Sequence, residues 1–288
     1  MFAVGVMNIR SLSILTALIV STAGFGCGTN APKTRDQGVT PEPAASVANP
    51  SSSDAQTVKI ESADKALLIG TFLEAEKANS PALLLLHQWQ SDRHSYDDFA
   101  KRMQAKGFNV LSIDGRGFGE SKKTADGKPI APVRTDAAVK AMLGDVDAAF
   151  AYLTRQKNVD PAKIGIVGAS YGSSLALIYA ADHPNVAAVA LLSPGLNYFG
   201  NMPTEPAVKR YGERPLFLVA AEDDVESAEC VRQLFKADKA ARQMIYPSGG
   251  HGTELFKVPA TNGRPILSVA LYNFLDQVLI GGATTYTK

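Results

Sequence analysis

From residue 58 onward, short apolar runs alternate with longer segments in which apolar residues recur every three or four positions. The short runs predict strands and the longer segments predict helices, because side chains alternate along a strand and return to one face of a helix about every 3.6 residues. Eight strands are predicted, at Val58–Ile60, Leu67–Phe72, Ala82–Leu86, Asn109–Ile113, Ile164–Val167, Ala187–Leu192, Pro215–Ala220 and Gln243–Tyr246. Helices are predicted at Tyr96–Lys106, Ala137–Gln156, Tyr171–Ala181, Ser227–Lys239 and Pro265–Leu279. This alternation indicates an α/β domain, with a mostly parallel eight-stranded sheet and helices on both faces.

The first 57 residues follow a different pattern. An apolar run of about nine residues, Leu12–Val20, comes after Arg10 and before small residues, which is typical of a secretory signal peptide and too short to cross a bilayer. Proline, serine and alanine without periodic apolar positions then predict a disordered linker. We therefore predict a signal peptide over 1–26, a linker over 27–57 and one folded domain over 58–288.

Cys27 ends the predicted signal region, directly after Gly26. This arrangement resembles the lipobox of bacterial lipoproteins, which implies that Cys27 is acylated and becomes the mature N-terminus. The resemblance predicts an exported protein that is anchored to a membrane through this lipid alone, in the periplasm or at the outer surface. An ordinary secreted or periplasmic form is the alternative.

Composition excludes several classes of function. The 288 residues carry a net charge of +1 and no basic run longer than two residues, so the chain lacks the electrostatic footprint of a nucleic-acid-binding protein. No H-E-x-x-H or C-x-x-C spacing occurs, and no metal or other cofactor is predicted. With two cysteines, one of them Cys27, a structural disulfide is not expected.

The most informative motif is Gly168-Ala169-Ser170-Tyr171-Gly172, which lies between a predicted strand and a predicted helix. A G-x-S-x-G string can arise by chance among 24 glycines, but this context favours a nucleophile elbow, in which a sharp turn presents the serine above the sheet edge. A serine hydroxyl is a weak nucleophile at neutral pH. Ser170 therefore requires a histidine base and a carboxylate that orients it.

The chain has four histidines, and His251 alone leaves room for an acid between the serine and itself in the chain order serine, acid, histidine. His251 lies in a glycine-rich loop after a predicted strand, where it can reach over the sheet edge. Three consecutive carboxylates, Glu222, Asp223 and Asp224, follow the preceding strand and compete for the role of the acid.

At this point the chain resembles the α/β-hydrolase superfamily, and the resemblance covers residues 58–283. The superfamily pattern G-x-x-D maps onto Ala221–Asp224, with alanine in place of glycine. The resemblance implies that Asp224 is the acid, with Asp223 as the alternative. Glu222 is then interpreted as a solvated charge or a helix cap.

Acyl transfer also needs donors for the oxyanion of the tetrahedral intermediate. The backbone N–H of Tyr171, directly after the nucleophile at a helix N-terminus, is one candidate. The superfamily pattern His-Gly-x corresponds here to His87-Gln88-Trp89, which implies that the Trp89 N–H is the second. Gln88 stands where the superfamily has glycine, and its side chain is the alternative donor.

A further superfamily marker, D-x-R-G-x-G-x-S, corresponds to residues 114–121 and implies that Asp114 and Arg116 brace turns near the site. A dinucleotide-binding glycine loop is the disfavoured alternative, because its third glycine would fall at Glu120.

The predicted insertion between Leu192 and Pro215 is only 22 residues long and leaves no room for a multi-helix cap domain. We expect an open site, with Trp89, Tyr171, Tyr198 and Phe199 as candidate pocket walls and ordinary packing as the alternative for these aromatic residues. The layout without a lid resembles dienelactone-hydrolase-like and acyl-peptidase-like members, although dienelactone hydrolases have a cysteine where this chain has Ser170.

The resemblance implies a serine hydrolase that cleaves small carboxylic esters through an acyl-enzyme, using Ser170, His251 and Asp224. Two alternatives remain open: a serine peptidase for small or acylated peptides, and a surface binding protein that keeps the fold without catalysis. No oligomeric state is predicted.

Overall fold

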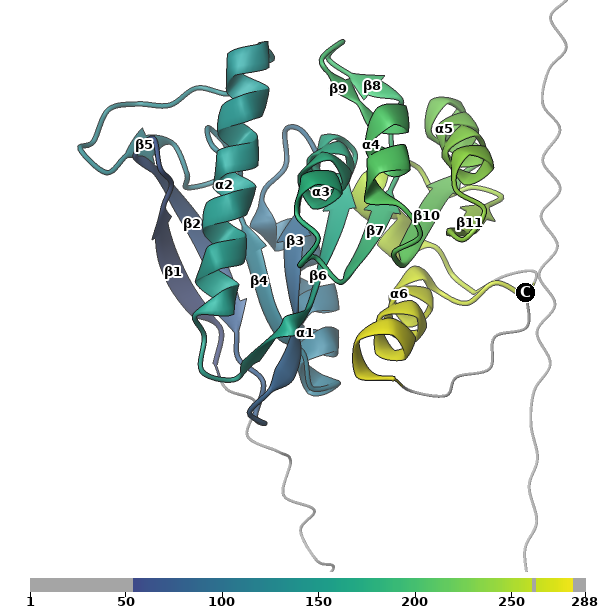
Figure 1. Cartoon of the computed structure of the whole chain (residues 1–288), viewed down its shortest axis with the longest axis horizontal. Helices are drawn as coiled ribbons and strands as arrows, with labels where there is room; N and C mark the ends of the chain where they lie inside the picture. The colour runs from purple at the N-terminus through teal and green to yellow at the C-terminus, as the bar shows by residue number, and fades with distance from the viewer. Residues whose placement is uncertain (1–53, 261–262, 282–288) are drawn as a thin grey trace, which may run out of the picture. The chain divides into compact units, whose positions relative to one another are not determined.

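The structure, a computed structural model, describes residues 54–260 and 263–281 (Figure 1). The first strand begins at Gln56, two residues before the predicted start of the domain. The predicted signal peptide over 1–26, Cys27 and nearly all of the linker over 27–57 lie outside the described residues, so export and lipidation stay predictions.

The central sheet contains all eight predicted strands. Along its main path their order is β1 (Gln56–Glu61), β2 (Ala66–Leu73), β4 (Asn109–Ile113), β3 (Ser80–Leu86), β6 (Val159–Ala169), β7 (Ala188–Leu192), β10 (Leu216–Ala221) and β11 (Arg242–Tyr246). The strand β2 pairs antiparallel with β1 and β4, and every later pair on this path is parallel. The mostly parallel sheet is therefore confirmed.

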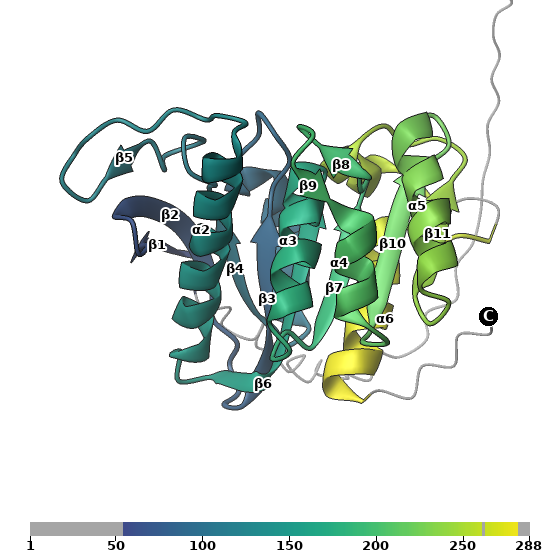
Figure 2. The same ribbon diagram turned by 45° about the horizontal axis from the view of Figure 1, so that its top comes forward.

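Helices cover both faces of this sheet, as predicted (Figures 1 and 2). One face packs against α2 (Asp136–Thr154), α3 (Tyr171–Asp182), α4 (Thr204–Tyr211) and α5 (Val225–Ala237). The other packs against α1 (Asp97–Ala105) and α6 (Leu267–Leu275). Short segments of other helix types are η1 (Arg93–Tyr96), η2 (Gly252–Lys257) and η3 (Asp276–Ile280). None of the helices within the described residues is long and apolar enough to span a membrane.

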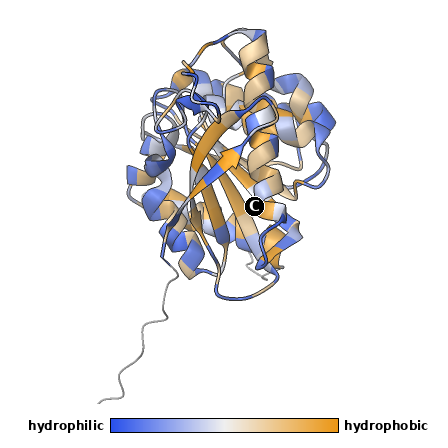
Figure 3. Ribbon diagram, turned by 90° about the vertical axis from the view of Figure 1, so that its left-hand side faces the viewer, coloured by the Kyte–Doolittle hydropathy of each residue, from blue (hydrophilic) through white to orange (hydrophobic). Residues whose placement is uncertain are grey.

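The two faces of β3 explain its unbroken apolar run. Leu84 packs toward the α2 and α3 side, whereas Leu83 and Leu85 pack toward the α1 and α6 side. Side chains of consecutive strand residues point to opposite faces, and a central parallel strand is buried on both. The hydropathy colouring shows mostly apolar strands in the sheet and helices in which polar and apolar residues are mixed (Figure 3).

Three short strands and one helix were not predicted. A ninth strand, β5 (Lys123–Thr124), pairs with β2, but two residues are too few to produce an alternating pattern. The insertion after β7 contains a hairpin of β8 (Asn197–Tyr198) and β9 (Met202–Pro203), followed by α4. This insertion adds one helix beside α3 and α5, and no cap domain forms.

The loop after β4 contains two arginine–carboxylate contacts that position it. Asp114 is fully buried, pairs with the guanidinium of Arg93 and accepts the backbone N–H of Glu120 at 2.8 Å. Arg116 donates to both carboxylate oxygens of buried Asp145 on α2, each at 2.6 Å, and also pairs with Asp64 at 2.7 Å.

We predict that Arg116→Met lowers the free energy of unfolding by about 3 kcal/mol, because it leaves the Asp145 carboxylate buried without its cation. Chemical denaturation at pH 7 measures this loss. The double variant Arg116→Met/Asp145→Leu should recover much of it, since an apolar pair removes the uncompensated charge. A single variant as stable as the wild type would contradict the prediction.

Candidate active site

Ser170 occupies a sharp turn between β6 and α3. Its backbone angles are φ 53° and ψ −124°, in a region that side chains other than glycine rarely adopt. A Cβ on Gly168 would lie 2.2 Å from the Gly172 carbonyl oxygen, and a Cβ on Gly172 would lie 2.6 Å from the carbonyl oxygens of Leu86 and His87. The two glycines therefore allow the close backbone approach that this turn requires.

The structure brings Ser170, His251 and Asp224 together. His251 Nε2 lies 2.7 Å from Ser170 Oγ, and His251 Nδ1 lies 2.7 Å from Asp224 Oδ2. The serine is 6 % exposed, whereas the imidazole is 39 % and the carboxylate side chain 15 % exposed. The serine is thus nearly buried, whereas its histidine partner is partly open to solvent.

Asp224 is held in its charged form. Burial raises the pKa of its carboxyl group, but hydrogen bonds from His251, Ser227 and Ser193 more than compensate, and the net pKa is lowered. An ionised carboxylate at this position accepts the Nδ1–H of the imidazole and leaves Nε2 free to accept the serine proton.

The three competing carboxylates have different partners. Asp224 contacts the imidazole, Asp223 accepts the backbone N–H groups of Gly249 and Gly250, and Glu222 pairs with Arg232 of α5 at 2.6 Å. Asp223 therefore holds the loop that carries His251 and does not contact the imidazole. Because Asp223 and Asp224 are adjacent in the sequence, the sequence alone could not show which of them contacts the histidine.

The backbone N–H groups of Tyr171 and Trp89 come from two segments in direct contact. Tyr171 is the first residue of α3, and Gly172 packs against the carbonyls that precede Trp89. Trp89 lies in a turn closed by the Ser91 N–H and the Gln88 carbonyl, at 3.2 Å. Neither the Trp89 nor the Tyr171 N–H donates to another group within the described residues.

The side chain of Gln88 has a role that sequence reasoning missed. Its amide oxygen accepts the backbone N–H of Thr253 at 2.7 Å and the Thr253 hydroxyl at 3.0 Å. Gln88 thus joins the loop after β3 to the loop that carries His251. The replacement of the usual glycine marked this position as unusual, but the sequence did not indicate its partner.

Aromatic rings line one side of the elbow. Trp89 packs edge-on against Phe118, Tyr171 and Phe199, with ring centroids 4.8, 5.4 and 4.8 Å apart. Tyr171 is buried and belongs to the core, so it is not an open pocket wall. Trp89 and Phe199 are only partly buried, and Phe118 is a member of this cluster that the sequence did not indicate.

The Tyr198 hydroxyl donates to the Ser193 carbonyl at 2.9 Å. Burial raises the pKa of Tyr198, although contacts with the hydroxyls of Ser170 and Ser227 act in the opposite direction. The Tyr198 hydroxyl therefore lies near the hydroxyls of Ser170 and Ser227.

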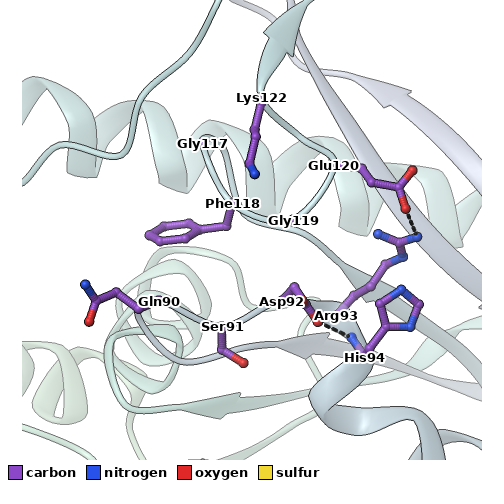
Figure 4. Close-up of a pocket in the computed structure, with 10 residues that line it drawn as sticks. All are labelled: Gln90, Ser91, Asp92, Arg93, His94, Gly117, Phe118, Gly119, Glu120 and Lys122. Carbon is purple, nitrogen blue, oxygen red and sulfur yellow. Dashed lines mark hydrogen bonds and ion pairs between the residues drawn. The ribbon is translucent and has the colours of Figure 1, made fainter.

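A cavity of about 520 Å³ lies beside the aromatic cluster, between the loops that follow β3 and β4 (Figure 4). Gln90, Phe118, Glu120 and Lys122 line it, and Ser170, Asp224 and His251 do not. Arg93 also lines the cavity, and its buried guanidinium pairs with Asp114 and Glu120. Much of its positive charge is therefore compensated by these two carboxylates. Within the described residues, no three histidine, cysteine, aspartate or glutamate side chains are grouped to hold a metal ion.

His87 is buried and accepts the Gly115 N–H through Nε2 at 2.9 Å, while Nδ1 lies 2.8 Å from the Gln88 carbonyl. Both contacts are satisfied by a neutral imidazole protonated on Nδ1. Burial lowers the pKa of His87 below its ordinary value of 6.5, despite the opposing effects of the Gln88 carbonyl and Asp114. The folded protein therefore holds His87 neutral.

We predict that His87 makes the fold less stable in acid. Below about pH 6.5 the unfolded chain binds a proton at this residue that the folded protein does not bind, so stability is complete above that pH and falls as the pH drops. Denaturation between pH 5 and 7 should show a smaller pH dependence for His87→Gln than for the wild type. Equal slopes for the two proteins would contradict this prediction.

Comparison with known proteins agrees with this architecture. A protein-family model with the description "alpha/beta hydrolase fold" matches residues 81–211 of this chain. An uncharacterized protein of Mycobacterium tuberculosis is 28 % identical over 262 residues, which span 84 % of this chain and 85 % of that protein.

Three solved structures are similar at low sequence identity. An esterase of Pyrococcus furiosus has a TM-score of 0.62 at 16 % identity and covers 78 % of this chain and 91 % of its own. A dienelactone hydrolase of Anabaena variabilis has a TM-score of 0.57 at 18 % identity, over 79 % and 97 %. An acylaminoacyl peptidase of Pyrococcus horikoshii has a TM-score of 0.61 at 14 % identity, over 81 % of this chain and 43 % of its own. The matched segment, the sheet order and these neighbours together establish that this chain has the α/β-hydrolase fold.

Proposed function

We propose that this protein is a serine hydrolase that cleaves carboxylic esters through an acyl-enzyme intermediate. The observation that carries the proposal is the continuous chain of contacts from Asp224 through His251 to Ser170, with both distances at 2.7 Å. Such an arrangement removes the serine proton during attack and stabilises the imidazolium that forms.

In the first half-reaction, Ser170 Oγ attacks the ester carbonyl carbon while its proton passes to His251 Nε2. The carbonyl oxygen gains negative charge, and the N–H groups of Tyr171 and Trp89 donate to it. As the intermediate collapses, His251 returns the proton to the leaving alkoxide. The alcohol departs, and the acyl group remains on Ser170.

In the second half-reaction, His251 Nε2 takes a proton from water as that water attacks the acyl carbon. The bond to Ser170 Oγ then breaks, and the serine recovers its proton from His251. The carboxylic acid is released. Asp224 stays ionised throughout and keeps the imidazole oriented, which agrees with its lowered pKa.

The connection between β7 and β10 is short and contributes a hairpin and one helix, so the site has no cap domain that would enclose a substrate. A peptidase for small or acylated peptides is supported by the similarity to the Pyrococcus horikoshii enzyme, but this chain covers only 43 % of that protein.

We predict that Ser170→Ala lowers hydrolysis of p-nitrophenyl acetate and butyrate by about 10⁴-fold or more, because no other group supplies the nucleophile. The variant should keep the wild-type circular dichroism spectrum and melting temperature to within a few degrees. Steady-state assays of both proteins, with a fluorophosphonate probe for covalent labelling, measure this. Unchanged turnover would contradict the serine mechanism, and an absence of both turnover and labelling in the wild type would favour a non-catalytic binding protein.

The two adjacent aspartates offer a matched comparison. We predict that Asp224→Asn lowers kcat by about 10⁴-fold, because an amide no longer fixes the required imidazole tautomer. Asp223→Asn should lower kcat by less than about tenfold, since its amide oxygen still accepts the N–H groups of the histidine loop. Assays of both variants on p-nitrophenyl butyrate test the order, and a larger loss in Asp223→Asn would reverse the assignment.

A further inference from the structure

Arg134 lies over two of the aromatic rings beside the candidate active site. Its guanidinium carbon is 4.8 Å from the Trp89 ring centroid and 4.7 Å from the Phe199 ring centroid. A cation over an aromatic face is attracted by the ring quadrupole, and a guanidinium in this position keeps its N–H groups for other partners.

Arg134 is exposed. Within the described residues, its guanidinium forms no ion pair with an acidic side chain. The other two arginines near the site differ in this respect. Arg93 pairs with Asp114 and Glu120, and Arg116 pairs with Asp64 and Asp145. The charge of Arg134 therefore faces two aromatic rings and is not compensated by a carboxylate.

The backbone around Arg134 is fixed to the hairpin that carries Phe199. The side-chain amide of Asn201 donates to the Arg134 carbonyl at 3.1 Å and to the Asp136 carboxylate at 2.9 Å. Asn201 lies between β8 and β9, directly before β9. Arg134 is thus held both by the contacts of its guanidinium with Trp89 and Phe199 and by the hydrogen bond from Asn201 to its backbone. This restraint reduces the conformational entropy that is lost when a ligand binds.

The aromatic cluster below Arg134 extends to the residue that follows the nucleophile. Trp89 contacts Tyr171, the residue after Ser170, with centroids 5.4 Å apart. Phe199 follows Tyr198 in the hairpin of β8 and β9, and the Tyr198 hydroxyl donates to the Ser193 carbonyl at 2.9 Å. The ring of Trp89 therefore separates the guanidinium from Tyr171, the residue directly after the serine.

We propose that Arg134 determines substrate specificity by binding a carboxylate of the substrate, so that the preferred substrates are esters that also carry a free carboxylate. The inference rests on the proposed esterase function of Ser170. A planar guanidinium donates two parallel N–H groups to a carboxylate, and this bidentate geometry gives selectivity for that group over a neutral one.

The test compares matched neutral and anionic esters on the full-length protein. One pair places the carboxylate in the acyl part: p-nitrophenyl valerate and the mono-p-nitrophenyl ester of glutaric acid. The other pair places it in the alcohol part: phenyl butyrate and 4-carboxyphenyl butyrate. Arg134→Gln should lower kcat/KM about tenfold for at least one anionic ester, mainly through KM, and change the neutral esters less than about twofold.

Two further variants control for charge. Arg134→Lys keeps the charge but loses the fork, and should recover part of the loss. Lys140→Gln removes a neighbouring exposed cation that contacts no aromatic ring in the described structure, and should leave both ester classes unchanged. An equal effect of Arg134→Gln on neutral and anionic esters, or an equal loss in Lys140→Gln, would overturn the inference.

Trp89 is the only tryptophan of the chain, so its fluorescence provides a readout that does not depend on catalysis. Monomethyl glutarate should change the emission of Ser170→Ala, and this change should disappear in Ser170→Ala/Arg134→Gln. Binding that depends on Arg134 without any ester hydrolysis by the wild type would overturn the proposed function. Hydrolysis of neutral esters, with no dependence of anionic esters on Arg134, would overturn only this inference.

Discussion

The candidate site depends on the backbone conformation of Ser170. A chain that ends a strand and begins a helix at one residue must adopt unfavourable angles there, and φ 53° places Ser170 in a strained region. The strain persists because the flanking segments are fixed: β6 is central in the sheet, and Gly172 packs against the carbonyls of Leu86 and His87. The stability of the central sheet therefore holds the hydroxyl in its position at the sheet edge.

The other site residues come from loops at the same sheet edge, and each loop is held by a contact outside the reacting atoms. Asp223 accepts backbone N–H groups of the glycine-rich loop, and Gln88 accepts the N–H of Thr253. Asp114, within the loop after β4, pairs with Arg93 and accepts the N–H of Glu120. Asp223, Gln88 and Asp114 thus hold in place the loops at the edge of the sheet where the reacting residues lie. Such supports limit the motion of groups that must remain aligned to within fractions of an ångström.

Much of the fold could be predicted from the sequence, because apolar periodicity is strong where strands are buried on both faces, as in Ala82–Leu86. Ser170 and His251 were also predicted, from the elbow motif and the chain order, whereas Asp224 was chosen over Asp223 on the superfamily resemblance. The strand β5 and the helix α4 were missed, since they are short and carry few apolar residues. The contacts of Gln88 and Arg134 were missed as well, because they depend on loop conformations that no local pattern encodes.

The contact between Ser170 and His251 spans 81 positions of the chain, and its acid partner lies beyond β10. The central strands can pair before β10 and β11 are added, and at that stage the serine has neither a base nor an oriented acid. An unactivated hydroxyl is chemically inert toward esters. Nucleophilic reactivity thus emerges only when the sheet edge is complete, so recovery of activity during refolding would report the last stage of assembly rather than formation of the core.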